Sequence, residues 1–350
     1  PAKSVEDPKV TALALHVSRE TFILPAIQQK GPHGIVKTAC GCQYSHHSRF
    51  KSSSDMVRII SIANQKGGVG KTTTAVNLAA CLAAGERPVV LIDLDPQGNA
   101  SSALGVDKRH VPFSMFDVLV EQKSLQSVFQ STPVECLTVA PANSDLVSAD
   151  YQLAGIHLGA KQLQGSISKY LWNLTAPDLP SYILIDCPPS VGYLTINALL
   201  ASDSVIIPVQ SEYFALEGLA ELVDSMTLMR QQYNPKLALE GILLTMFDAR
   251  TSLSREVQDD IRGVYGDLVF QTIIRRSVRL SEAPSHGIPI ILYDIRCHGS
   301  EDYLALAREI ILNEKKVTRS WFVRSPVGDA RRDSGESPVS GAVAGLDQRE

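Results

Sequence analysis

The chain has 350 residues, of which 44% are hydrophobic and 20% charged, and its net charge is −4. This size suits one large domain or two ordinary ones with a buried core, and the slightly acidic balance gives no sign of nucleic-acid binding for the chain as a whole. No apolar run approaches the roughly 18–20 residues that a membrane-spanning helix needs. The six cysteines are scattered, so we expect reduced thiols and a cytoplasmic protein.

Residues 1–55 differ in composition from the rest of the chain. Their apolar residues lack a clear period, and the dense alternation of strand and helix patterns begins at Met56. We therefore predict that residues 1–55 are a disordered or non-native extension and that Met56 is the native start. A metal site is the alternative, although its C-x-C spacing departs from the usual zinc pattern; it would be built from Cys40, Cys42, His46 and His47.

From residue 56 to 313, strand patterns alternate with helical ones. Segments such as Val89–Ile92 and Tyr182–Ile185 are almost entirely apolar, which is typical of strands covered on both faces. The sequence therefore predicts one α/β domain with a doubly wound, mostly parallel sheet and helices on both faces. The expected strands are Val57–Ala63, Pro88–Asp93, Glu135–Ala140, Ser181–Asp186, Ser204–Val209, Glu240–Met246 and Leu268–Ile273. The expected helices are Thr72–Ala84, Phe113–Val120, Leu146–Leu153, Gly159–Leu174, Tyr193–Leu200, Leu216–Tyr233, Ser254–Tyr265 and Glu301–Leu312.

A glycine-rich loop lies between the first expected strand and the first expected helix. It reads Asn-Gln-Lys-Gly-Gly-Val-Gly-Lys-Thr-Thr-Thr over residues 64–74, and strand, glycine loop and helix are the context of a phosphate-binding loop. The glycines bring backbone N–H groups close to phosphate oxygens, and the helix start favours the same anion. Lys71 would reach the β- and γ-phosphates, and the Thr72 hydroxyl would ligate Mg²⁺.

The loop departs from the usual G-x-x-x-x-G-K-[ST] pattern in two places. Gln65 occupies the position of the first glycine, and a second lysine, Lys66, opens the loop. From its position, this lysine can serve either its own nucleotide or one bound by a partner subunit.

Two apolar strands end in aspartates. One block runs Asp-Leu-Asp-Pro-Gln-Gly-Asn from Asp93, and the other runs Asp-Cys-Pro-Pro-Ser from Asp186. Ligands of open α/β sheets gather at the carboxyl ends of the strands. An apolar strand that closes on aspartate supplies the carboxylate that holds Mg²⁺ in nucleoside triphosphatases, often through water. We therefore expect Asp186 near Thr72.

These blocks together resemble the ParA/MinD family of ATPases, and in particular the ParA/Soj chromosome- and plasmid-partitioning proteins. The glycine loop is similar to the deviant Walker A loop of the family, and the two aspartate blocks are similar to its other nucleotide motifs. The resemblance extends from about Met56 to Leu312. Further matching blocks are Pro141–Asn143, Pro208–Gly218, Thr245–Thr251 and Val278–Ser285.

The resemblance implies a P-loop NTPase fold and Mg²⁺-dependent ATP hydrolysis. It also implies an ATP-bound homodimer that binds double-stranded DNA without sequence preference and is released when a ParB/Spo0J-like partner stimulates hydrolysis. The protein would then be cytoplasmic and associated with the nucleoid.

The same resemblance assigns residues. Lys66 would cross to the partner's nucleotide and Asp95 would help to activate the attacking water, so Lys66, Lys71 and Asp95 are the catalytic candidates. Asp186 would hold Mg²⁺ with Thr72, and Arg250 and Arg279 would contact the DNA backbone. Nucleotide contacts are expected from Lys66, Gly67, Gly68, Val69, Gly70, Lys71, Thr72, Thr73, Arg275 and Ser277.

Arg275 and Ser277 replace the proline and asparagine that lie against adenine in relatives, and this puts the base contact in doubt. A second departure is Cys297-His298, near the end of the family match. We do not expect these two residues to form a catalytic pair, because adjacent side chains rarely converge.

Three other functions stay open. A MinD-like membrane-associated positioning ATPase would need an amphipathic C-terminal helix. The segment around Trp321-Phe322 is the single membrane-surface cue in residues 314–350, which we otherwise expect to be a disordered tail, so membrane binding is not expected. A metal-cluster relative would need cysteines shared across a dimer, often as a C-x-x-C motif, and this chain has no such motif. A metabolic kinase would need an acceptor site that the sequence does not reveal.

Overall fold

The computed structural model describes residues 57–313, apart from residues 191 and 213–214. The predicted extension 1–55 and tail 314–350 lie outside the described residues. So do the C-x-C metal candidate and the membrane cue at Trp321-Phe322.

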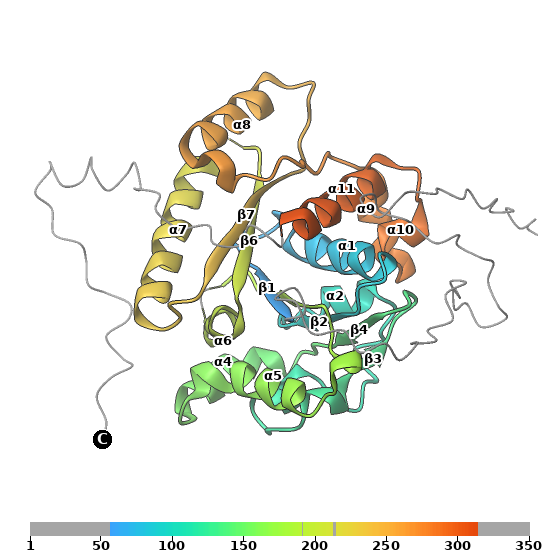
Figure 1. The fold of residues 1–350 in the computed structure, drawn as a ribbon, viewed down its shortest axis with the longest axis vertical. Coiled ribbons are helices and arrows are strands. Elements are labelled where there is room, and N and C mark those ends of the chain that lie inside the picture. Colours follow the sequence, from blue (N-terminus) through green and yellow to red (C-terminus); the bar gives the residue numbers. More distant parts are fainter. Residues whose placement is uncertain (1–56, 191, 213–214, 314–350) are drawn as a thin grey trace, which may run out of the picture.

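The described chain forms a seven-stranded sheet in the order β3-β4-β2-β5-β1-β6-β7 (Figure 1). All neighbouring strands run parallel except the β3–β4 pair, which is antiparallel. This confirms the predicted doubly wound fold. The strands are β1 (Arg58–Ile62), β2 (Val89–Asp93), β3 (Gln130–Ser131), β4 (Leu137–Ala140), β5 (Tyr182–Asp186), β6 (Ser204–Gln210) and β7 (Ala238–Thr245).

Helices cover both faces of the sheet (Figure 1). One face packs against α1 (Lys71–Ala84), α2 (Asn99–Ala103), α9 (Val278–Glu282), α10 (Ile290–Tyr293) and α11 (His298–Asn313). The other packs against α3 (Met115–Leu119), α4 (Leu146–Gly155), α5 (Gln162–Trp172), α6 (Tyr193–Ala201), α7 (Ala215–Gln232) and α8 (Ser252–Tyr265). Short 3₁₀ helices connect these elements: η1 (Leu125–Val128), η2 (Gly159–Lys161), η3 (Ala176–Asp178), η4 (Gly266–Leu268) and η5 (Ala283–His286).

The apolar strands follow from this double cover. In β5, Tyr182 and Leu184 belong to the core beneath α1 and α11, whereas Ile183 and Ile185 belong to the core beneath the opposite helices. Successive side chains of a strand point to opposite faces, so a strand with two covered faces must be apolar at every position.

The predicted strand Leu268–Ile273 is wrong. Val269 makes only an isolated bridge with Ile242, and the segment follows the edge of the sheet without forming a ladder. Its Phe270 side chain packs where Gly241 has no Cβ, since a Cβ there would lie 2.5 Å from the ring. Here the apolar pattern reflects burial against β7 rather than strand pairing.

Candidate nucleotide-binding site

The phosphate-loop candidate connects β1 to α1 in the predicted strand–loop–helix arrangement. Gly68 and Gly70 have φ of +77° and +89°, a left-handed conformation that glycine adopts at no steric cost. The Thr245 hydroxyl at the end of β7 donates to the Val69 carbonyl at 2.8 Å. The loop is therefore held by the end of β7, which lies two strands from β1 in the sheet. A Cβ added at Gly67 or Gly68 would meet nothing within 4 Å.

The first turn of α1 faces this loop. The first helical bond is made by Thr74 N–H to the Gly70 carbonyl at 2.9 Å, so the N–H groups of Lys71, Thr72 and Thr73 are those that a helix leaves without an internal partner. They form an anion-binding set at the positive end of the helix dipole.

Lys71 is buried at the base of the loop, with 6% of its surface exposed. Its ammonium donates to the Lys66 carbonyl at 3.0 Å. Burial lowers the pKa of Lys71, and the negative charge of Asp186 opposes that fall. A desolvated cation with one hydrogen bond retains donors for a phosphate.

Asp186 and Asp93 lie side by side at the carboxyl ends of β5 and β2, where they are paired in register. Asp186 is fully buried, and neither carboxylate oxygen has a hydrogen-bond partner within the described part of the chain. Burial raises its pKa well above the usual range, and Asp93 adds to the rise. The Thr72 hydroxyl opposes this rise from nearby without reaching hydrogen-bonding geometry. An unsatisfied buried carboxylate beside a hydroxyl fits a hard divalent cation such as Mg²⁺.

Asp93 has a different environment. Its carboxylate accepts from the Ser101 hydroxyl at 2.7 Å, the Ser101 N–H at 2.8 Å and the Asp95 N–H at 3.2 Å. Burial raises its pKa to about 6. Asp93 therefore anchors α2 and the backbone of Asp95, a positioning arrangement to which the sequence had assigned no clear role.

Asp95 lies in a tight turn directly after β2. It is 8% exposed, and its Oδ1 accepts from the Gln97 N–H at 2.9 Å. The charges of Asp186 and Asp95 both oppose the fall in the pKa of Lys71, so the predicted acidic and basic side chains lie close enough to interact.

Lys66 forms an ion pair at the surface. Its ammonium lies 2.6 Å from Glu212, and the two side chains are 51% and 46% exposed. Its backbone N–H donates to Asn64 Oδ1 at 2.9 Å. The two loop lysines thus occupy opposite environments: Lys71 is buried within the loop and Lys66 lies at the surface.

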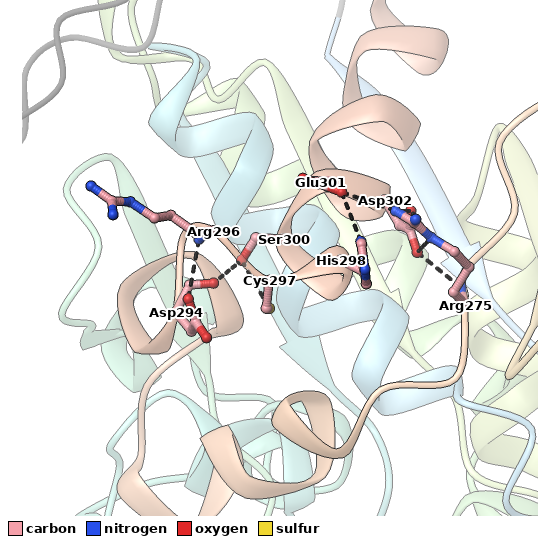
Figure 2. Close-up of polar contacts among 8 residues, drawn as sticks. All are labelled: Arg275, Asp294, Arg296, Cys297, His298, Ser300, Glu301 and Asp302. Carbon is pink, nitrogen blue, oxygen red and sulfur yellow. Dashed lines mark hydrogen bonds and ion pairs between the residues drawn. The ribbon is translucent and has the colours of Figure 1, made fainter.

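Arg275 and Ser277 lie beside the loop after β7, because Phe247 N–H donates to the Ile274 carbonyl and Arg276 N–H donates to the Phe247 carbonyl. Arg275 is tied to α11 (Figure 2): its Nη2 lies 2.6 Å from Asp302 and 3.1 Å from Glu301. With 42% of its side chain exposed, it retains a free surface, and its contact with a base stays a prediction. Ser277 directly precedes α9 and makes no side-chain cap.

Cys297 and His298 engage different neighbours (Figure 2). The Cys297 thiol lies 3.7 Å from the Ser300 hydroxyl, and His298 Nδ1 lies 3.1 Å from Glu301. This agrees with the expectation that they are not a catalytic pair.

The candidate DNA-contacting arginines both carry carboxylate partners. Arg250, 88% exposed, lies 2.6 Å from Asp248. Arg279 lies 3.0 Å from Glu282 and 3.6 Å from Asp294. Both arginines are therefore exposed and form ion pairs within their own chain. The sequence did not reveal these pairs.

Sequence reasoning missed three side chains around the site. Glu212 pairs with Lys66, Thr245 donates a hydrogen bond to the phosphate loop, and Lys108 donates one to the turn after Asp95. Glu212 and Thr245 lie within blocks that carried the family resemblance, so a signal for them existed. Nothing in the spacing pointed to Lys108.

In the described ranges, no helix is long and apolar enough to span a membrane, and no cluster of three or more His, Cys, Asp or Glu side chains could hold a metal ion. The pair of Asp186 and Thr72 is not such a cluster. If it held Mg²⁺, water and phosphate oxygens would fill most of the coordination positions of the ion.

Comparison with known proteins agrees with this geometry. A family model described as an AAA domain matches residues 57–239. The sporulation initiation inhibitor protein Soj of Bacillus subtilis is 50% identical over 258 residues, which cover 74% of this chain and 100% of Soj. The chromosome partitioning protein ParA of Myxococcus xanthus is 48% identical over 254 residues, which cover 73% of this chain and 88% of that protein.

Among solved structures, a cobyrinic acid a,c-diamide synthase from Mycobacterium smegmatis with bound ATP analogue and magnesium has a TM-score of 0.64 and 33% identity. The match covers 75% of this chain and 98% of that one. The match to Soj, at 50% identity, covers the whole length of Soj. The fold and the placement of the loop and aspartates agree with this match. The chain therefore belongs to the ParA/Soj family of partitioning ATPases.

Proposed function

We propose that this protein is a DNA-segregation ATPase whose ATP-bound dimer binds double-stranded DNA without sequence preference. The chain is an ATPase that uses ATP and Mg²⁺, and its family is that of partitioning proteins. A ParB/Spo0J-like partner would stimulate hydrolysis and release the dimer from DNA, and the protein would act in the cytoplasm on the nucleoid.

The observation that carries the proposal is the opposite placement of the two loop lysines. Lys71 is buried within the loop and can serve only its own nucleotide. Lys66 is half exposed, and the hydrogen bond of its ammonium is to Glu212 at the surface. An exposed ion pair of this kind contributes little to stability, so it can be exchanged for contacts with a second subunit's nucleotide.

The roles of the remaining residues follow from their positions. Lys71, the loop backbone from Lys66 to Gly70 and the N–H groups of Thr72 and Thr73 would bind phosphate oxygens. Thr72 and Asp186 would hold Mg²⁺, with Asp186 acting through water. Bound Mg²⁺ would neutralise charge on the phosphates.

Asp95 would orient the attacking water, since a carboxylate at hydrogen-bonding distance can accept its proton. Arg275 and Ser277 would border the base. Arg250 and Arg279 would contact DNA phosphates.

Co-sedimentation with a DNA fragment tests this function. The protein should sediment with DNA in ATP and Mg²⁺ but not in ADP or without nucleotide. Lys66→Ala should still bind ATP, yet remain monomeric by light scattering and fail to sediment. A normal ATP-dependent dimer of this variant would show that the lysine does not cross between subunits.

A further inference from the structure

The turn that carries Asp95 is held partly from within. Gly98 N–H donates to the Asp95 carbonyl at 2.8 Å, and Gln97 N–H donates to Asp95 Oδ1 at 2.9 Å. Gly98 adopts a left-handed φ of +60° and directly precedes α2 as its N-cap residue. The Gln97–Gly98 peptide thus holds the Asp95 carbonyl, and the Pro96–Gln97 peptide before it holds the Asp95 carboxylate, so the carboxylate depends on the geometry of the whole turn.

Lys108 reaches this peptide from a separate segment. Its ammonium donates to the Gln97 carbonyl, and its Cδ lies over Gly98, where an added Cβ would come within 2.7 Å of it. The lysine thus contacts both ends of one peptide unit. Its own backbone is fixed by a turn in which His110 N–H donates to the Asp107 carbonyl at 3.0 Å. The Asp107 carboxylate accepts from Arg109 N–H at 3.2 Å and lies 2.8 Å from His110 Nδ1.

We propose that Lys108 is a positioning residue for ATP hydrolysis, which acts by fixing the Gln97–Gly98 peptide and, through the bond of this peptide to the Asp95 carbonyl, the turn that directs the Asp95 carboxylate. The proposal rests on the proposed role of Asp95 as the group that orients the attacking water. The ammonium bonds the backbone of the turn, so its effect is geometric. Without it the Gln97–Gly98 peptide can rotate, the bond from Gly98 N–H to the Asp95 carbonyl is weakened, and the turn that directs the Asp95 carboxylate loosens.

The position of Lys108 separates this effect from nucleotide binding. The contacts of Lys108 are with the turn after β2, whereas the phosphate loop is held by Thr245 and by Lys71. Loss of the ammonium should therefore lower kcat and leave the binding of ATP unchanged. Small displacements of catalytic groups cost up to about 100-fold in rate.

The test uses the full chain with Lys108→Met, which keeps the methylenes over Gly98 and removes the ammonium. We expect kcat to fall by about 10–100-fold, with unchanged KM, unchanged affinity for a fluorescent ATP analogue and an unchanged melting temperature. Lys108→Arg, which restores a donor, should recover most of the parental kcat. Lys169→Met, at an exposed position of α5, controls for the loss of one positive charge.

A double-mutant cycle decides whether Lys108 acts through Asp95. In single-turnover hydrolysis over long incubations, Lys108→Met should cause no further loss once Asp95→Ala is present. An additive loss, a raised KM or a parental kcat in Lys108→Met would overturn the positioning role. If Asp95→Ala itself turned over at the parental rate, the proposed role of Asp95 would fail, and the positioning role would fail with it.

Discussion

Two lysines five positions apart in one loop have opposite environments. Burial penalises the charge of Lys71, whereas Lys66 keeps a solvated charge next to Glu212. A buried cation is retained only where a charge compensates it, and here Asp186 and Asp95 supply that charge when no nucleotide is bound. In the proposed function, phosphate oxygens would take over this role.

Lys71→Ala should weaken ATP binding by about 10–100-fold, since it removes a charge-assisted contact in a desolvated site. Fluorescence titration with a labelled ATP analogue gives the affinity. Lys66→Ala is the comparison from the same loop and should still bind ATP, with a smaller loss of affinity than Lys71→Ala. Equal affinities of Lys71→Ala and the parent would place the phosphates elsewhere.

Asp186→Ala should have opposite effects on the free and the nucleotide-bound protein. Without ligand, the melting temperature should stay the same or rise, because a buried carboxylate with unpaired oxygens is removed; loss of its attraction for Lys71 limits the gain. With ATP and Mg²⁺, the ligand-induced rise in melting temperature should largely disappear. Thermal unfolding with and without ligand measures both, and a parental Mg²⁺-dependent shift would exclude Asp186 as a metal-binding group.

At the scale of elements, most of the fold was predictable because the apolar pattern of each segment agrees with the alternation of strands and helices along the chain. The apolar runs of β2 and β5 could fit only a sheet covered on both faces. The missed elements, α2, α9, α10 and β3, have five residues or fewer, too short for a period to show. Their structure depends on tertiary contacts, as when Asp93 anchors the start of α2 through Ser101.

Part of the candidate site was predictable from the sequence and part was not, for the same reason. The phosphate loop and the aspartates at the strand ends are local patterns, and the structure brings them together as predicted. The partners of these groups come from distant segments: Lys66 meets Glu212, 146 residues away, and Val69 meets Thr245, 176 residues away. Such pairs depend on strand order, which one sequence does not specify.

The link between α11 and the segment after β7 gives a prediction at this scale. Asp302, 7% exposed, accepts from both the backbone N–H and the guanidinium of Arg275. Asp302→Asn should lower the free energy of unfolding by about 1–2 kcal/mol, because it weakens hydrogen bonds to a charged group. Chemical denaturation measures this loss.

Glu301→Gln is the matched control for the Asp302 variant. Glu301 contacts the same arginine, but 56% of its side chain is exposed, so its loss should cost less than about 1 kcal/mol. Equal losses in the two variants would contradict a role for burial in this link.

At the scale of the whole molecule, the proposed function requires a chain with a net charge of −4 to bind DNA. The loop after β7 and the segment before α9 lie together through the Phe247 backbone bonds. Arg250 lies in that loop, and Arg279 lies in the first turn of α9. Both arginines are paired with carboxylates, so one subunit offers little excess positive charge. Joining two subunits doubles the contacts, and electrostatic affinity rises steeply with contact number.

Arg250→Ala and Arg279→Ala should therefore each weaken DNA binding strongly while ATP-driven dimerisation survives. The slope of log affinity against log salt should fall by about 0.9 for each phosphate that the variant no longer neutralises, and binding of the parent should not depend on DNA sequence. Fluorescence anisotropy at two salt concentrations measures affinity and slope, with light scattering to confirm the dimer. Arg308→Ala, at an exposed position of α11, is the control and should bind as the parent does. Parental affinity and slope in the double variant would place the DNA surface elsewhere; Arg276, exposed on the same segment, would then be tested before Arg275, whose guanidinium is held by Asp302 and Glu301.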